Sequence, residues 1–333
     1  MTVLLTGSIA YDYIMVFPGY FKDHILPDKI AQISVSFLVD SMKKQRGGVA
    51  PNIAYNLALL GERPKIMATV GEDFADYRQW LELHGVDTSA IVEIPDEFTA
   101  SFFVSTDKDQ NQIASFYTGA MAYAHQLSFK DHVGEGIELA VISPNDPRAM
   151  TQYVRECKEL GIPYIYDPSQ QIIRLSGDEL LEGVRGSKML IVNDYEFEML
   201  KNKTGWTAEQ VAGAAEIVIV TKGEGGSTIT LRERLNAPIE IPIAEPRRIA
   251  DPTGVGDAYR AGIIKGMIHG LDWETTGRMG SLAATCALEE YGTQNHQYEL
   301  DEFISRFGQE FGDWFQIAKL ESSEEKAGSK LEG

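Results

Sequence analysis

The sequence predicts a three-layer α/β fold, in which a doubly wound, mostly parallel sheet carries a small inserted β-sheet lid. Two observations predict the core: short apolar strands alternate with amphipathic helices, and 333 residues that are 44% hydrophobic suffice to bury a large core. The third observation predicts the lid, because two stretches in the N-terminal third break this alternation and show the period-two pattern of half-buried antiparallel strands.

The core elements follow one another along most of the chain. Strands are expected over residues 3–9, 65–70, 139–143, 164–166, 189–192 and 217–221. Helices are expected over residues 50–60, 74–84, 256–270, 275–291 and 300–311. Such an alternation favours a parallel sheet that is covered by helices on both faces.

The lid is expected from two separate segments. Residues 32–39 alternate in polarity, with Phe37 among the apolar set, and residues 99–105 and 112–117 flank a turn-like Asp-Lys-Asp-Gln-Asn, which is a hairpin signature. Extra edge strands of the main sheet are the alternative interpretation. We predict a core over residues 1–12, 49–97 and 121–320, a lid over residues 13–48 and 98–120, and a polar, disordered tail over residues 321–333.

Charge and the N-terminal sequence limit the classes of partner and the compartment. The formal net charge is −19 and the pI is about 4.7, so the surface repels nucleic acid and anionic lipid. We therefore expect no nucleic-acid partner and no membrane partner. The first residues have no basic segment before their apolar run and carry Asp12, which is unlike a secretory signal. A cytoplasmic location is the expectation.

The most informative segment is residues 251–262, Asp-Pro-Thr-Gly-Val-Gly-Asp-Ala-Tyr-Arg-Ala-Gly. Gly254 and Gly256 flank Val255 immediately before a helical pattern, so backbone amides at the start of a helix can approach an anion closely. A transferring phosphoryl group is the guest that this arrangement suits. Asp257 follows directly and is the candidate general base. The alternative role for Asp257 is a simple helix cap.

Five segments together resemble the ribokinase-like (PfkB) family of carbohydrate and nucleoside kinases. Residues 251–262 resemble its C-terminal signature, although Pro252 and Val255 stand where Thr and Ala are more usual. The other four segments resemble, in chain order, its opening strand, its N-terminal signature, its Asn-Xaa-Xaa-Glu motif and its nucleotide loop: Gly-Ser-Ile-Ala-Tyr-Asp (7–12), Gly-Gly-Val-Ala-Pro-Asn (47–52), Asn-Asp-Tyr-Glu (193–196) and Thr-Lys-Gly-Glu-Gly-Gly (221–226).

The resemblance implies ATP-dependent phosphoryl transfer to a hydroxyl group. The residues that it assigns to substrate binding are Asp12, Gly47, Gly48 and Asn52, and we add Phe116 as a lid aromatic. For the nucleotide, the residues are Asn193, Thr221, Gly223, Gly226, Ala284 and Asn295. Glu196 is expected to hold Mg²⁺ through a water molecule, because Mg²⁺ prefers oxygen ligands and keeps several waters. A monovalent cation such as K⁺ near Asp251 is a further implication of the resemblance.

Several segments resemble bacterial and archaeal adenosine or nucleoside kinases more than sugar kinases. They are residues 17–26, 115–121, 167–171 and 289–296. The leading hypothesis is therefore adenosine kinase, with a sugar kinase acting on ribose, fructose or a related sugar, or a kinase of another nucleoside, as alternatives. A non-catalytic nucleoside-binding protein is the rival from a different class. Exposed lid edges leave both a monomer and a homodimer open.

Overall fold

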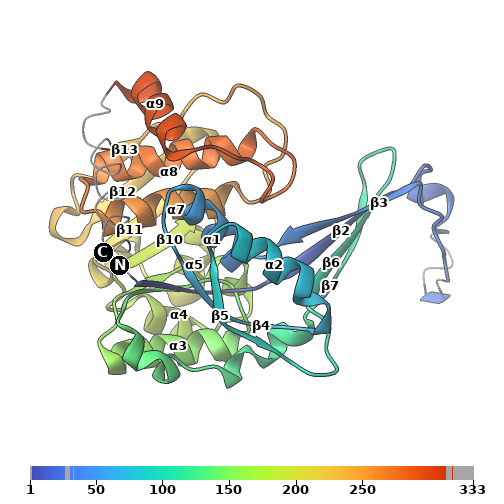
Figure 1. The fold of residues 1–333 in the computed structure, drawn as a ribbon, viewed down its shortest axis with the longest axis horizontal. Helices are drawn as coiled ribbons and strands as arrows, with labels where there is room; N and C mark the ends of the chain where they lie inside the picture. Colours follow the sequence, from blue (N-terminus) through green and yellow to red (C-terminus); the bar gives the residue numbers. More distant parts are fainter. Residues whose placement is uncertain (1, 27–30, 33, 313–316, 318–333) are drawn as a thin grey trace, which may run out of the picture.

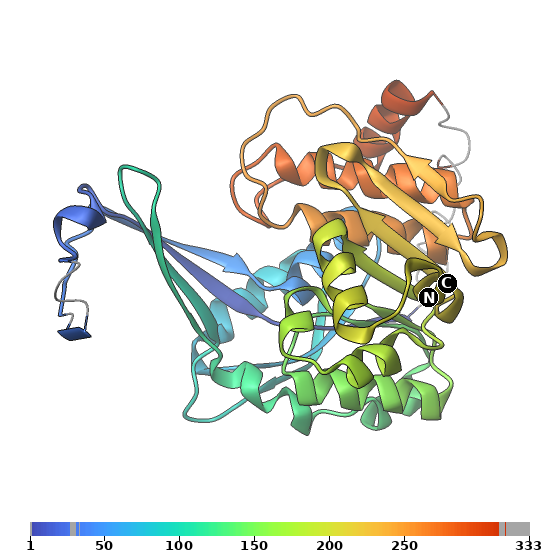
Figure 2. The ribbon, with the colours of Figure 1, turned by 180° about the vertical axis from the view of Figure 1, so that it is seen from behind.

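The computed structural model describes residues 2–26, 31–32, 34–312 and 317, and it confirms the expected fold class. A mostly parallel sheet lies between two layers of helices, and a separate four-stranded mixed sheet, in which β2 (Ala10–Val16) and β6 (Ala100–Thr106) are parallel, projects from one side of this body (Figures 1 and 2). No helix within the described ranges is both long and apolar enough to cross a bilayer. The expected disordered tail at residues 321–333 lies outside the described residues.

The main sheet has the strand order β13-β12-β11-β10-β9-β8-β1-β4-β5. The run from β11 to β5 is parallel, and β12 and β13 are added antiparallel at one edge. The strands are β1 Thr2–Thr6, β4 Lys65–Val70, β5 Asp87–Glu93, β8 Ile137–Ile142, β9 Tyr164–Tyr166, β10 Met189–Asn193, β11 Ile217–Thr221, β12 Ser227–Leu231 and β13 Ile239–Ile241. From β1 the chain first adds β4 and β5 on one side and then returns to add β8 on the other. This switch point is where open α/β sheets bind ligands, at the carboxyl ends of the strands.

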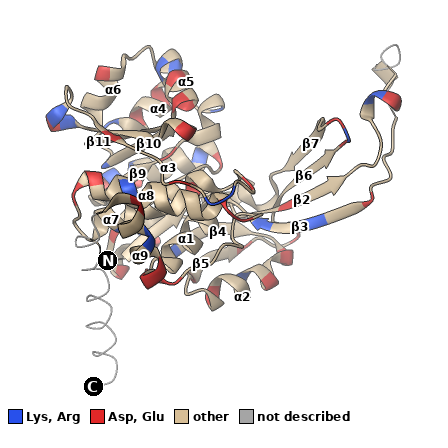
Figure 3. Cartoon of the chain, turned by 90° about the horizontal axis from the view of Figure 1, so that it is seen from above, with Lys and Arg blue, Asp and Glu red and all other residues tan. Residues whose placement is uncertain are grey.

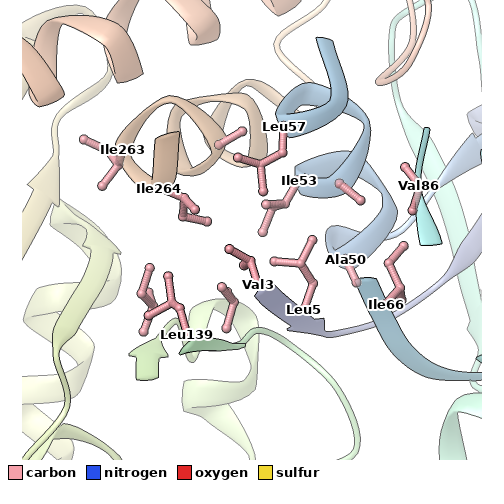
Figure 4. Packing of buried hydrophobic residues seen from close by; sticks show 14 of the residues in the cluster. Val3, Leu5, Ala50, Ile53, Leu57, Ile66, Val86, Leu139, Ile263 and Ile264 are labelled. Atoms are coloured by element: carbon pink, nitrogen blue, oxygen red, sulfur yellow. The ribbon is translucent and has the colours of Figure 1, made fainter. Parts of the chain in front are cut away.

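Alternate residues of the strands bury opposite faces of the sheet. Val3 and Leu5 of β1 pack into the cluster that holds Ile53 and Ile263, whereas Leu4 packs into the cluster on the other face (Figure 4). The first face is covered by α1 Val49–Leu59, α2 Ala75–Leu83, α7 Val255–Ile268 and α8 Trp273–Leu288, with α9 Leu300–Phe311 packed on α8. The other is covered by α3 Pro147–Leu160, α4 Gly177–Val184, α5 Asp194–Thr204 and α6 Ala208–Ala214.

Short 3-10 helices complete the connections between these elements. They are η1 Phe21–Asp23, η3 Glu72–Phe74, η4 Gly119–Gln126, η5 Phe129–Glu135, η6 Ser169–Ile173, η7 Gly223–Gly225 and η8 Arg232–Arg234. Two of them matter for the site, because η6 follows β9 and η7 joins β11 to β12 at the carboxyl edge of the sheet.

The lid is a sheet of its own, so the alternative of extra edge strands is wrong. Its strand order is β3-β2-β6-β7, and β6 and β7 form the expected hairpin. The strands are β2 Ala10–Val16, β3 Ser41–Gly47, β6 Ala100–Thr106 and β7 Gln112–Tyr117. Helix η1, which follows β2, lies at the end of the lid that is far from the body (Figure 1).

Two expectations about the first lid segment are wrong. The first core strand ends at Thr6, and Asp12 lies inside the lid strand β2 instead of at the end of a core strand. Residues 34–39 form no strand, and Ile33 lies outside the described residues. Phe37 instead packs its ring against Phe17 and Phe21.

The strand that pairs with β2 is the polar β3. It carries Lys43, Lys44 and Arg46 and is partly blue in Figure 3. Its residues are largely exposed, so it does not need an apolar alternation. Pairing with a neighbouring strand therefore overrides its weak intrinsic preference for β-structure.

Candidate active site

A cavity of about 270 Å³ opens at the carboxyl edge of the main sheet. Its walls come from the starts of α1, α5 and α7 and from the ends of β9, β10 and β11. The lining residues are Val49, Asp167, Ser169, Gln170, Asn193, Glu196, Thr221, Gly254, Gly256, Asp257 and Arg260. The structure therefore brings together the residues predicted from three of the sequence motifs.

Helix α7 begins at this cavity with the glycine pair. Gly254 is the N-cap with φ of 78°, and an added Cβ there would lie 2.9 Å from Cγ2 of Thr293. The first intrahelical bond runs from the amide of Ala258 to the carbonyl of Gly254, at 3.0 Å, so the preceding amides of Val255, Gly256 and Asp257 belong to the first turn. Of these three, the amide of Val255 makes a long contact of 3.5 Å with the carbonyl of Pro252. Such a turn attracts anions through its N–H groups and the helix dipole.

Asp257 lies in the first turn of α7 and is held by α1. Its Oδ2 accepts a hydrogen bond of 2.8 Å from Nδ2 of Asn52. Burial raises the pKa of Asp257 to about 7, although the Arg260 guanidinium and the Asn52 hydrogen bond act in the opposite direction. A carboxyl group with a pKa near neutrality is matched to general-base work at physiological pH.

A chain of buried polar side chains fixes the orientation of Asn52. Nε2 of Gln294 donates to Oδ1 of Asn52 at 2.9 Å and to the hydroxyl of Tyr77 at 2.5 Å. The Tyr77 hydroxyl in turn donates to the carbonyl of Gly47 at 2.9 Å. Asn52 therefore points its N–H group at Asp257, which links the predicted substrate residue to the predicted base.

Asn193 and Glu196 cap the start of α5. The amide of Glu196 donates to Oδ1 of Asn193 at 2.7 Å, and the amide of Asn193 donates to Oε2 of Glu196 at 2.8 Å. The Ser169 hydroxyl donates to the other Glu196 oxygen at 3.0 Å. No cluster of three or more potential metal ligands is present in the described ranges. Both carboxylate oxygens of Glu196 thus already accept hydrogen bonds. Such a carboxylate suits a Mg²⁺ ion that is held through a water molecule.

Five residues of the cavity were absent from the predicted site: Val49, Asp167, Ser169, Gln170 and Arg260. Asp167 and Arg260 are the charged pair among them. Asp167 follows β9 and is fully buried, and its oxygens meet Nη2 and Nε of Arg260 at 2.7 and 2.6 Å. The signal was present in the sequence, because Asp167 directly follows a short apolar strand and Arg260 lies one turn after Gly256. Asp167 also stands in one of the segments that resemble nucleoside kinases, and Arg260 stands in the segment that resembles the C-terminal signature of the family.

The predicted substrate residues do not line this cavity, but two of them, Asp12 and Phe116, share one face of the lid. Gln45, Asp12, Phe102 and Phe116 are in register across its four strands, so their side chains leave the same face. Burial, and secondarily Asp251, raises the pKa of Asp12 to about 6. Phe116 is half exposed. Asp12 and Phe116 thus have a common orientation that the sequence alone did not provide.

The remaining predicted residues are dispersed. Gly47 and Gly48 join β3 to α1, and Gly223 and Gly226 form the turn between β11 and β12. Ala284 is partly buried against the core, and Asn295 is exposed and lines a different hollow beside α9. Neither Ala284 nor Asn295 lines the cavity of Asp257.

The sequence and the structure are similar to known kinases over almost their whole length. Residues 9–299 match the pfkB family of carbohydrate kinases. The nucleoside kinase of Methanothermobacter thermautotrophicus is 30% identical over 93% of this chain and 96% of its own. A structure of the Burkholderia thailandensis nucleoside kinase in complex with inosine is 37% identical, with a TM-score of 0.81 over 94% of this chain and 99% of that one. The same kinase in complex with ADP-inosine gives 38% and 0.80, over 94% of this chain and 97% of that one.

The family match covers the lid strand β2, the cavity and the start of α7. Glycines at a helix N-terminus, an adjacent carboxyl group and an oxygen-lined hollow are all features that phosphoryl transfer requires. The chain belongs to the ribokinase-like pfkB family of nucleoside and carbohydrate kinases, and it is an ATP-dependent kinase that phosphorylates a hydroxyl group.

Proposed function

We propose that this kinase transfers the γ-phosphoryl group of ATP to the 5′-hydroxyl of a nucleoside, and that adenosine is its substrate. The observation that carries this proposal is the environment of Asp257. Its carboxyl group lies beside the open first turn of α7, accepts a hydrogen bond from Asn52 and has a pKa raised by burial to about 7. A base of this strength can accept the proton of a hydroxyl group as that group attacks phosphorus.

The reaction follows from this placement. Asp257 accepts the proton of the 5′-hydroxyl while the hydroxyl oxygen forms a bond to the γ-phosphorus, and the bond from that phosphorus to the β,γ-bridging oxygen breaks. ADP leaves with the bridging oxygen, and the nucleoside becomes a 5′-monophosphate. The amides of Val255, Gly256 and Asp257 donate to the transferring phosphoryl group, where negative charge must be stabilised. Mg²⁺ supplies further charge neutralisation when it is bound with the nucleotide, and Glu196 would hold it through water.

The substrate residues of the proposal lie on the lid and at its base. A carboxylate such as Asp12 can accept hydrogen bonds from both ribose hydroxyls. Phe116 and its in-register neighbour Phe102 offer aromatic faces to a base. The nucleotide residues of the proposal are Asn193, Thr221, Gly223, Gly226, Ala284 and Asn295. A K⁺ ion near Asp251 belongs to the same proposal.

The similarity to nucleoside kinases supports a nucleoside over a free sugar. The complex of the Burkholderia thailandensis enzyme with inosine makes inosine the second candidate, because it differs from adenosine only in the base. Ribose and fructose remain the substrates that a sugar kinase of the family would take.

The decisive experiment is ADP release with Mg-ATP against a panel of adenosine, inosine, guanosine, cytidine, ribose and fructose. The proposal expects turnover on nucleosides with adenosine preferred, and loss of turnover in Asp257→Asn. Turnover on inosine in preference to adenosine would support a nucleoside kinase whose preferred nucleobase is hypoxanthine and not adenine. Turnover confined to a sugar would overturn the proposal that the substrate is a nucleoside. Binding of adenosine by the wild type without any ADP release would favour a non-catalytic nucleoside-binding protein.

A further inference from the structure

We infer that Arg260 is a second catalytic residue, which donates a hydrogen bond from its guanidinium to the transferring phosphoryl group. The inference deepens the proposed function and rests on it. Arg260 is the single cationic side chain among the described residues that line the cavity, which it shares with the carboxyl groups of Asp167, Glu196 and Asp257. A site that binds a triphosphate needs positive charge, and this protein carries a net charge of −19.

The position of the guanidinium follows from helix geometry. Arg260 lies one turn after Gly256 on α7, and helical side chains point back toward the N-terminus of their helix. The guanidinium therefore reaches back over the open first turn. A Cβ atom built on Gly256 would lie 2.8 Å from Nη1 of Arg260, so glycine at this position leaves room for the guanidinium beside the anion-binding amides.

The buried carboxylate of Asp167 holds Arg260 in place. Nη2 donates to Oδ1 at 2.7 Å, and Nε lies 2.6 Å from Oδ2. This two-point contact uses one edge of the planar guanidinium and fixes its orientation. Among the hydrogen bonds of the described residues, the guanidinium contributes only the one from Nη2, and none involves the remaining nitrogen, Nη1. The nitrogen that faces Gly256 is thus the one that is available to a phosphoryl oxygen.

The positive charge of Arg260 also acts on Asp257, the proposed general base. The guanidinium of Arg260 works against the effect of burial on Asp257, so it favours the ionised carboxylate that accepts the proton. The balanced step is unchanged: the acceptor oxygen bonds to the γ-phosphorus, the bond to the bridging oxygen breaks, and the proton goes to Asp257. Arg260 adds a donor to a non-bridging oxygen of the phosphoryl group and neither gains nor loses a proton.

The test uses three variants of the full chain with Mg-ATP and whichever nucleoside the wild type phosphorylates. Arg260→Gln removes the positive charge. Arg260→Lys keeps the charge but lacks the planar guanidinium with its several N–H donors. Asp167→Asn/Arg260→Gln removes both members of the ion pair. We expect kcat to fall at least ~10²-fold in Arg260→Gln and in the double variant, because a donor aimed at developing charge contributes about that much, while the Kd of ADP changes far less. Arg260→Lys should retain an intermediate kcat.

The double variant separates catalysis from folding. Arg260→Gln alone leaves Asp167 buried without its partner and is expected to unfold at a lower temperature, whereas the neutral Asn–Gln pair avoids this penalty. A stable double variant that still lacks turnover supports the inference. So does an upward shift in the pH midpoint of the residual kcat of Arg260→Gln, in which Asp167, whose charge raises the pKa of Asp257, is kept. A double variant with wild-type kcat would show that the ion pair is structural only. A wild type that releases no ADP with any acceptor overturns the proposed function and this inference together.

Discussion

Nδ2 of Asn52 donates a hydrogen bond of 2.8 Å to Oδ2 of Asp257, and this bond joins residues of two helices that lie 205 positions apart in the sequence. Asn52 lies on α1, which begins at the base of the lid, and Asp257 lies in the first turn of α7. The contact couples the end of the lid to the proposed base. The hydrogen bond also stabilises the ionised form of Asp257, whereas burial disfavours that form.

Replacement of Asp257 by Asn should abolish the base while it keeps the shape of the site. We expect kcat for nucleoside phosphorylation to fall by roughly 10²–10⁴, the range for loss of a general base. The Kd of adenosine should stay within a few-fold of the wild-type value. Steady-state kinetics and calorimetric titration measure the two quantities, and a variant with near wild-type kcat would remove Asp257 from the base role.

The pH dependence of kcat should report the ionisation of Asp257. Because its pKa in the folded protein is about 7, the carboxylate form is scarce at pH 5 and dominant at pH 8, so kcat should rise across this interval. Asn52→Asp replaces the donor by a second carboxylate and should move the midpoint upward by about one unit or more. Asn56→Asp, one turn further along α1 and in contact with His296, is the matched control with an unmoved midpoint.

The same raised pKa should make stability depend on pH. The folded protein holds the Asp257 proton up to a pKa of about 7, whereas the unfolded chain releases it near the ordinary value of 3.8. The ionisation of Asp257 therefore lowers the free energy of unfolding as pH rises from about 4 to 7, by at most ~4 kcal/mol in total. Asp257→Asn lacks this loss, so its free energy of unfolding relative to the wild type should increase between pH 5 and pH 8. Denaturant unfolding at both values measures it, and an unchanged difference would contradict the raised pKa.

A methyl group on Gly47 should disturb Asp12. A Cβ on Gly47 would lie 2.6 Å from Oδ2 of Asp12, so the carboxylate must move. If Asp12 holds the ribose hydroxyls, Gly47→Ala should raise the KM for the nucleoside on the order of tenfold or more, because hydrogen bonds to charged groups contribute about 1.5–3 kcal/mol. Gly213→Ala is the control, since an added Cβ there meets nothing within 4 Å. Equal KM values for the two variants would count against Asp12 as a ribose ligand.

Truncation of Phe116 should test which lid aromatics meet the substrate. Phe116→Ala should raise the KM for adenosine about 2- to 10-fold with little effect on the KM for ATP, as expected for loss of an aromatic contact. Ile113 is similarly exposed on the same strand but points to the opposite face, so Ile113→Ala is the matched control. An equal response of the two variants would indicate a general effect on the lid.

The sequence predicts the core well wherever apolar strands alternate with helices. Lys65–Val70, Tyr164–Tyr166, Ile217–Thr221 and Leu300–Phe311 have the predicted bounds. The hairpin of β6 and β7 was predicted because its pattern and its turn are both local. The start of α7 at the glycine pair was predicted for the same reason, since the signals for a helix N-terminus lie in consecutive residues.

The sequence pattern fails where the decisive interactions are not local. β3 is polar and exposed, and it is a strand because β2 pairs with it, so its own pattern does not predict it. The alternation at residues 34–39 belongs instead to a segment whose Phe37 packs with other rings. The ion pair of Asp167 and Arg260 joins residues 93 apart, and no pattern along the chain can show that they meet.

The packing of α1 against α7 also has a consequence for the newly made chain. Ile53 and Leu57 of α1 are buried in the cluster that contains Ile263 and Ile264 of α7 (Figure 4). At roughly 5–20 residues per second, a ribosome needs about 10–40 seconds to proceed from the end of α1 to the start of α7. During that interval the apolar face of α1 has no native partner from α7. The N-terminal part of this kinase is therefore the part that has the most to gain from a chaperone during synthesis.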